Sequence, residues 1–328
     1  MIPQVSLLVT LVLLIDRLPE PPKPPQKRGR GRSRVYSDRL FLKALVIMIV
    51  KRLHCVSALL AVINEPTAEM QELKLLLTEN GKVPCERTWR RRLAALPDTL
   101  PAQIGCLGRL LTERICPWKD GSAAVAMDST LFRARGGVWH KKHKDAGVVP
   151  HTRIDTQAGW TKSGWHGWVY GWKLPLISAV GDVWIPLAAN VTPANRADNL
   201  EVETLLPELP NQPLFALGDQ HYNTPEVRQC CRLRSCTLVA TKRGKPPHTD
   251  AGVEVRRVFH ALRSHSIENF NQQFKSIFEG HEQVPTKGIV ATRRYLLGAV
   301  LVYQLALWYR FEQGLPLRVG LKAFLKAA

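Results

Sequence analysis

Two aspartates stand at the ends of short apolar runs, where an α/β fold can do chemistry. Asp128 follows Ala123–Met127, and Asp219 follows Leu214–Leu217 and one glycine. Runs of this length predict buried strands, and the reactive groups of α/β sheets commonly lie at the carboxyl ends of such strands. Either aspartate alone is also compatible with chance, so the interpretation depends on a third group.

That third group is Glu268, which lies in Arg263–Phe278. The spacing of apolar residues there predicts an amphipathic helix. Its apolar face comprises Ile267, Phe270, Phe274, Ile277 and Phe278, and its polar stripe comprises Glu268, Asn271, Gln272 and Lys275. Taken alone, such a stripe is equally the ordinary solvated side of a helix.

Together the three carboxylates predict a site for two divalent ions. Carboxylate oxygens are hard ligands of the kind that Mg²⁺ and Mn²⁺ prefer. Two ions about 4 Å apart can activate a water or a 3′-hydroxyl and stabilise the leaving oxygen of a phosphodiester. Lys275 lies two helical turns beyond Glu268 and is placed to bind a substrate phosphate. The chemistry indicated is in-line attack on a nucleic-acid backbone.

The composition agrees with a polyanionic partner. The chain has 328 residues with 46 Lys and Arg against 27 Asp and Glu, which leaves a formal charge of +19. Nucleic acid is the first candidate and an anionic membrane surface the second. An apolar content of 45% argues against a wholly disordered chain.

The sequence favours a reducing, cytoplasmic setting. Its seven cysteines are odd in number, and Cys230, Cys231 and Cys236 lack the paired spacing of a zinc site. The apolar run Val5–Ile15 is too short to span a bilayer and has no cleavage site after it. It predicts a short helix that packs against the rest of the protein.

Composition divides the chain into three regions. Residues 1–35 hold the apolar segment and a Pro- and Arg-rich linker, whose Arg-Gly run at 28–34 is either a solvated linker or an arm that lies on DNA. Residues 36–117 are predicted to be helical, with Ser37 as a helix cap. Residues 118–328 alternate apolar strands with helices, which predicts a mixed α/β sheet.

Three basic clusters are candidates for contact with DNA. In the helical region a helix at 67–78, a glycine turn and an Arg-rich helix resemble a helix-turn-helix; the alternative is a helical bundle with a basic exposed face. The candidate residues are Arg90, Arg91 and Arg92 in that helix, Lys141 and Lys142 after the first aspartate, and Arg293 and Arg294 near the C-terminus. Each cluster is also compatible with an ordinary solvated surface.

The chain resembles the DDE transposases of bacterial insertion sequences, in the insertion-sequence-four/five-like group. The matching segments are Gly-Arg-Ser-Arg-Val-Tyr-Ser-Asp-Arg at 31–39, Arg-Thr-Trp-Arg-Arg-Arg-Leu at 87–93, Ala-Met-Asp-Ser-Thr at 126–130, Gly-Trp-Lys at 171–173, Thr-Pro-Ala-Asn-Arg-Ala-Asp at 192–198, Gly-Asp-Gln-His-Tyr at 218–222 and Ile-Glu-Asn-Phe-Asn-Gln-Gln-Phe-Lys at 267–275. They spread over most of residues 31–312.

The resemblance implies a ribonuclease-H-like catalytic core that follows a basic, helical DNA-binding region. It implies two Mg²⁺ or Mn²⁺ ions on Asp128, Asp219 and Glu268, with Tyr222 and Lys275 positioning phosphates. The implied partners are double-stranded DNA, as the element's terminal repeats and as the target, and a second copy of the chain in a paired-end complex. No membrane is implied, and the implied location is the bacterial nucleoid.

The signature of the family around its glutamate is Tyr, two residues, Arg, three residues, Glu, six residues, Lys. Glu268 and Lys275 match it. Ser264 stands at the Arg position, with Arg263 one residue early, and Ala261 stands at the Tyr position. Arg263 is therefore a candidate for the same phosphate contact. The alternative is a decayed or repurposed transposase that only binds DNA.

Overall fold

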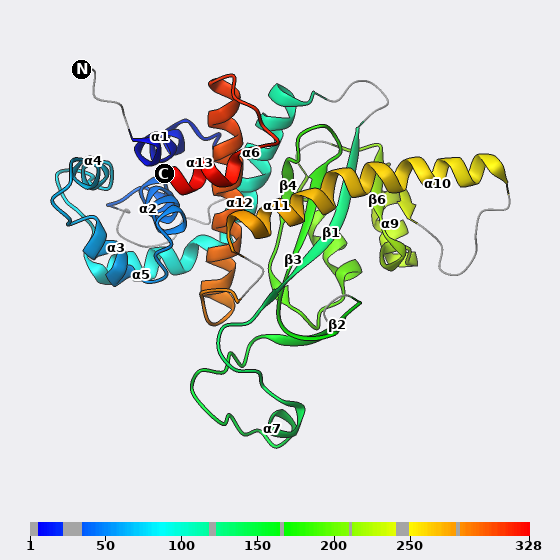
Figure 1. Cartoon of the computed structure of the whole chain (residues 1–328), viewed down its shortest axis with the longest axis horizontal. Coiled ribbons are helices and arrows are strands. Elements are labelled where there is room, and N and C mark those ends of the chain that lie inside the picture. The colour runs from blue at the N-terminus through cyan, green and yellow to red at the C-terminus, as the bar shows by residue number, and fades with distance from the viewer. Residues whose placement is uncertain are drawn as a thin grey trace, which may run out of the picture.

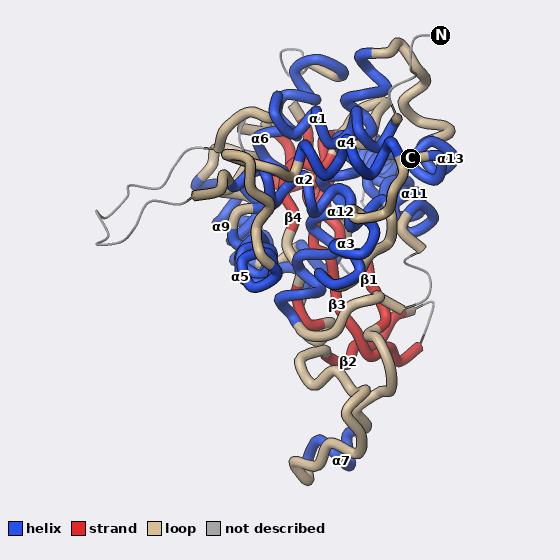
Figure 2. Tube along the Cα trace, turned by 90° about the vertical axis from the view of Figure 1, so that its left-hand side faces the viewer, coloured by secondary structure: helices blue, strands red, loops and turns tan. Residues whose placement is uncertain are grey.

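The computed structural model describes residues 6–21, 35–117, 123–164, 167–209, 212–240, 249–279 and 283–328. Helices from both ends of the chain gather on one side, and a sheet lies on the other (Figure 1). A loop that carries the short helix α7 projects from one end of the sheet (Figures 1 and 2). The Arg-Gly run at 28–34 lies outside the described residues.

The N-terminal helices bury their apolar faces against one another. They are α1 (Leu7–Leu14), α2 (Asp38–Val50), α3 (Val56–Val62), α4 (Ala68–Leu76), α5 (Glu86–Ala95) and α6 (Leu100–Ile115), with 3-10 turns at Ile15–Arg17 and Leu96–Asp98. The short packed helix predicted from Val5–Ile15 is confirmed, because α1 is largely buried and contacts α2. Ser37 caps α2 as predicted, since its side chain accepts a hydrogen bond from the N–H of Leu40.

The sheet contains both parallel and antiparallel pairs, as the α/β pattern predicted. Its strands are β1 (Ala124–Arg133), β2 (Gly159–Ser163), β3 (Gly167–Ala179), β4 (Pro186–Ala189), β5 (Thr192–Pro193), β6 (Phe215–Gly218) and β7 (Thr237–Ala240). The order is β2-β3-β1-β6-β7, and β4 and β5 also pair with β3. Strand β1 is antiparallel to β3 and parallel to β6, which is parallel to β7. The long strand β1 is therefore central.

The remaining helices surround this sheet. They are α7 (Lys141–Asp145), α8 (Val202–Leu205), α9 (Pro225–Leu233), α10 (Asp250–Arg263), a π-helical turn (Ser264–Glu268), α11 (Asn269–Ile277), α12 (Ile289–Glu312) and α13 (Leu321–Ala327), with 3-10 turns at Asp198–Glu201 and Gln220–Tyr222. Helix α10 extends beyond the sheet, and α11 continues its line toward the helical side (Figure 1).

Helix α12 joins the two sides of the molecule. It packs against α2 and α6, while α6 packs against β4, so the core is continuous from α1 to the sheet. Its buried Gln304 donates through Nε2 to the carbonyls of Ile104 in α6 and Pro186 in β4, each at 2.9 Å. A buried amide that finds acceptors on both neighbours sets the position of α12 between them. Among the described residues, no helix has the length and apolar character needed to cross a membrane.

Two expectations about individual elements are wrong. The strand predicted to end at Met127 continues to Arg133, so Asp128 lies within β1. The pattern of residues 199–209 predicts a helix, but the structure has a 3-10 turn followed by the four-residue α8. Asp198 stands before this segment and has a residue type that commonly caps helices, but it pairs with Lys173 Nζ at 2.9 Å. In both places pairing with distant residues overrides the local pattern.

Candidate active site

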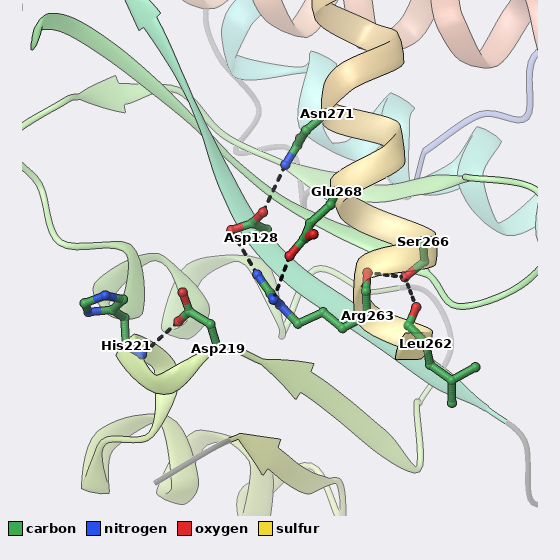
Figure 3. Close-up of polar contacts among 8 residues, drawn as sticks. All are labelled: Asp128, Asp219, His221, Leu262, Arg263, Ser266, Glu268 and Asn271. Atoms are coloured by element: carbon green, nitrogen blue, oxygen red, sulfur yellow. Dashed lines mark hydrogen bonds and ion pairs between the residues drawn. The ribbon is translucent and has the colours of Figure 1, made fainter. Parts of the chain in front are cut away.

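Strands β1 and β6 place the two aspartates side by side. Their parallel register pairs Ala126 with Leu217, so Asp128 and Asp219 both lie two positions further along neighbouring strands. Neighbouring strands are about 4.8 Å apart. Asp219 comes directly after β6 and accepts a hydrogen bond from the N–H of His221 at 2.7 Å (Figure 3). The parallel pair thus presents two carboxylates at one place.

Helix α11 and the π-turn before it bring Glu268 to the same place. The buried face of α11 lies against the sheet and α12, with the rings of Phe274 and Phe132 6.2 Å apart and those of Phe270 and Tyr303 5.1 Å apart. This packing turns the polar stripe of the helix toward β1. Figure 3 shows Glu268 and Asn271 pointing toward Asp128.

An arginine lies between two of the acids. Arg263 donates from Nη1 to Glu268 Oε1 at 2.9 Å, and its Nη2 lies 3.7 Å from Asp128 Oδ1 (Figure 3). Its side chain is only 10% exposed. Within the described ranges, no group of three His, Cys, Asp or Glu side chains is arranged as it stands to hold a metal ion. The positive charge among these carboxylates is that of the guanidinium.

The π-turn explains why an arginine five residues before the glutamate reaches it. Residues five apart on a regular α-helix point about 140° away from each other. The turn Ser264–Glu268 is wider and holds one extra residue. Arg263 and Glu268 therefore share one face, as their 2.9 Å contact requires. Arg263 stands one residue before the arginine position of the signature, and the extra residue of this wider turn matches that offset.

Asn271 is a site residue to which the sequence assigned no role. Its Nδ2 donates to Asp128 Oδ2 at 3.1 Å, while its buried Oδ1 has no hydrogen-bond partner among the described residues. An unpartnered buried amide oxygen on a residue that contacts Asp128 is a further oxygen donor close to the site. Its position three residues after Glu268 in the polar stripe was the available signal.

Burial and charge change the ionisation of Asp128. Burial raises the pKa of this carboxyl to about 6, and the negative charges of Asp219 and Glu268 act in the same direction. Arg263 and the hydrogen bond from the backbone of Ser129 lower the pKa and offset part of this rise. Asp219 and Glu268 are therefore close enough to Asp128 to influence its ionisation.

This raised pKa predicts how stability depends on pH in metal-free buffer. Between the ordinary value of 3.8 and about 6, the folded protein keeps a proton on Asp128 that the unfolded chain releases. The free energy of unfolding of the wild type should then fall, relative to that of Asp128→Asn, by about 3 kcal/mol as the pH rises through this window. Urea unfolding in EDTA at pH 4 and pH 7 measures the difference; a difference independent of pH would contradict the prediction.

Lys275 and Tyr222 differ in access to the site. Lys275 is half-buried with its Nζ 5.6 Å from the centre of the Phe132 ring, and burial lowers its pKa while the charge of Asp128 opposes this. Tyr222 is 3% exposed and packs against Gly218, where an added Cβ would lie 2.8 Å from the Tyr222 Cβ. Burial, followed by the nearby acids, raises its pKa. Tyr222 therefore packs inside the fold, whereas phosphate contact by Lys275 stays a prediction.

The three basic clusters lie on different parts of the surface. On α5, Arg90 and Arg91 are exposed, with Arg90 paired to Glu86, whereas Arg92 pairs with Asp38 and stacks over Phe41. On α12, Arg293 donates to the carbonyl of Pro97 at 3.4 Å, and burial lowers the pKa of Arg294. Arg92 and Arg293 thus connect helices, which leaves Arg90 and Arg91 as the accessible members of their cluster.

Lys141 and Lys142 are exposed on an arm that comprises residues 134–158 and carries α7. The base of the arm is held by Asp155, whose Oδ2 accepts from the N–H of Gly288 at 2.8 Å, and by Arg135, which donates to the carbonyl of Pro285 at 2.8 Å. Near the tip, Trp139 Nε1 donates to the carbonyl of Val148 at 2.9 Å. The lysines are therefore displayed on an ordered projection (Figure 2).

Comparisons with known proteins give remote similarity in structure and none in sequence. No protein-family model matches the sequence, and no curated protein matches it. Among solved structures, the fold is similar to a piggyBac transposase synaptic complex with hairpin DNA, at 9% identity and a TM-score of 0.42. The match covers 99% of this chain and 79% of the other.

Proposed function

We propose that this protein is a DDE-type transposase, which binds DNA ends and performs metal-dependent phosphodiester hydrolysis and strand transfer. The observation that carries the proposal is the convergence of Asp128, Asp219 and Glu268, which come from two neighbouring parallel strands and a helix packed across them. The influence of Asp219 and Glu268 on the pKa of Asp128 supports one shared site. Such a constellation is suited to divalent-ion chemistry on a phosphate backbone.

The sheet topology supports a ribonuclease-H-like core for this function. That expectation calls for a central strand with an antiparallel partner on one side and parallel strands on the other. Strand β1 lies between antiparallel β3 and parallel β6. The acids lie on the central strand and directly after its parallel neighbour, which is where this arrangement would bring them together.

The residues fit divalent ions by the chemistry of their donors. Three carboxylates and the unpartnered Oδ1 of Asn271 are oxygen ligands of the kind that Mg²⁺ and Mn²⁺ take. When bound, two such ions would supply an activated water or 3′-hydroxyl and stabilise the leaving oxygen. Asp128, Asp219 and Glu268 would hold them, while Lys275 and Arg263 would orient the phosphates of the substrate.

Double-stranded DNA is the proposed partner, read by more than one surface. Arg90 and Arg91 on α5 would contact the ends of the element, and the arm with Lys141 and Lys142 would contact the backbone beside the cut. We extend the proposal to two copies of the chain that act in one paired-end complex, as the family resemblance implies.

The arm makes a measurable contribution in this scheme. Replacing Lys141 and Lys142 together by Ala should weaken duplex binding and reduce the dependence of log K on log salt by about 2, since each lysine releases about one counterion from DNA. Binding titrations over several salt concentrations measure the slope. The matched control replaces Lys322 and Lys326, exposed on α13 at the helical side, and should leave the slope unchanged. An unchanged slope in the arm variant would remove the arm from the interface.

The decisive experiment is cleavage of a plasmid that carries the ends of the parent element. Wild-type protein is compared with Asp219→Ala, each with Mg²⁺ and with EDTA. Metal-dependent cuts at the element ends that disappear in the variant would support the proposal. Binding without cutting in every lane would instead favour a decayed transposase that acts only as a DNA-binding protein.

A further inference from the structure

Arg263, which contacts two of the three carboxylates, is held in an unusual way. Arg263 divides its guanidinium between two acids, with one N–H directed to Glu268 at 2.9 Å and the other nitrogen 3.7 Å from Asp128. Its Nε is buried without a hydrogen-bond partner among the described residues. This is not the two-bond fork that makes arginine–carboxylate pairs strong.

The acids nevertheless need a positive charge. Asp128 carries the cost of burial together with the repulsion of Asp219 and Glu268, and Arg263 is the largest influence that opposes these effects. The side chains of Asp128 and Glu268 are 22% and 43% exposed, so solvent screens only part of the repulsion between these carboxylates. A nearby cation is therefore favourable here, and Arg263 is bound by one hydrogen bond at 2.9 Å and one longer contact at 3.7 Å.

We infer that Arg263 is a stand-in cation, which neutralises the acids in the resting protein and leaves them when divalent ions bind. The inference rests on the proposed metal site. Guanidinium and divalent ions would compete for the same carboxylate oxygens, and their like charges oppose joint occupancy. The π-turn at Ser264–Glu268 interrupts the regular helix directly after Arg263, where such wider turns commonly occur at functional sites. Once released, the guanidinium is available to a DNA phosphate.

The test measures the affinity of the protein for Mn²⁺ by electron paramagnetic resonance, in the absence of DNA. Arg263→Gln should bind Mn²⁺ about tenfold more tightly than the wild type, because the competing charged hydrogen bonds are gone. Arg263→Lys should lie between, since one ammonium can pair with fewer oxygens. The matched control is Arg257→Gln on the same helix α10, whose arginine is 72% exposed and pairs with Glu254; it should leave the affinity unchanged.

Thermal unfolding gives a second readout that does not depend on activity. In EDTA, Arg263→Gln should unfold at a lower temperature than the wild type, because its acids lack their counter-charge. Added Mn²⁺ should raise its unfolding temperature by more than it raises that of the wild type. Arg257→Gln should follow the wild type in both conditions.

The outcomes separate this inference from the proposed function. Arg263→Gln and Arg263→Lys could bind Mn²⁺ no more tightly than the wild type, while Glu268→Gln still binds it more weakly. This result would overturn the stand-in role and leave the metal site in place. If Glu268→Gln does not reduce Mn²⁺ binding in either the wild type or Arg263→Gln, the metal site is overturned, and the stand-in role with it. Tighter binding by Arg263→Gln that is lost again in Arg263→Gln/Glu268→Gln supports both.

Discussion

Replacing Asp128 by Asn should reduce metal-dependent DNA cleavage about a thousandfold or more. Asp128 lies at the centre of the site, beside Asp219, which directly follows the neighbouring strand β6, and it is linked to Glu268 through Arg263. An amide has nearly the same shape but carries no negative charge with which to hold a divalent ion. Several kcal/mol of transition-state stabilisation would be lost with the ion, which corresponds to this factor in rate.

Initial rates of plasmid cutting in Mg²⁺ measure this loss, with duplex binding measured in parallel. Binding should be retained, because the basic surfaces lie on other elements. Asp182→Asn is the matched control. It makes the same chemical change at an exposed residue in the turn between β3 and β4. Cleavage by Asp128→Asn at the rate of the wild type would exclude Asp128 from the chemistry.

Replacing Phe274 by Ala should lower the free energy of unfolding by about 3–5 kcal/mol. Its fully buried ring lies between α11 and β1, within 6.2 Å of Phe132 and 4.9 Å of Phe278, measured between ring centres. The cavity left by a phenyl ring would loosen the contact that holds α11 over the sheet. Cleavage should fall as well, because Glu268 and Lys275 flank this residue on the same helical segment.

Urea unfolding, monitored by tryptophan fluorescence, measures the loss of free energy of unfolding. The comparison requires that the slope of this free energy against urea concentration is unchanged. Phe274→Leu keeps most of the apolar area and should lose less. Asn269→Ala is the control on the same helix: its Nδ2 makes an exposed bond to the carbonyl of His265, so the change should stay within about 0.5 kcal/mol. If Phe274→Ala loses no more free energy of unfolding than Asn269→Ala does, this ring does not anchor α11.

The sequence by itself determined the strands and the helix that carry the candidate site and which residues could carry the chemistry. The apolar runs before Asp128 and Asp219 and the amphipathic pattern around Glu268 predicted strands and a helix that the structure contains. Ser37 and Thr67 predicted helix starts, and both cap a helix through a side-chain hydrogen bond. These features depend on neighbours within a few residues, so periodicity and capping chemistry are sufficient to locate them.

Only the tertiary structure decided how the polar side chains are used. Arg92 and Tyr222 had the residue types of DNA contacts, yet Arg92 pairs with Asp38 of another helix and Tyr222 is buried beside Gly218. Asn271 gained its contact with Asp128 from a residue 143 positions away. Arg263 reaches Glu268 because one turn of the helix is π-helical, which the regular 3.6-residue period does not predict. Packing between distant segments sets burial, register and ion pairs, and local patterns in the chain carry no record of those contacts.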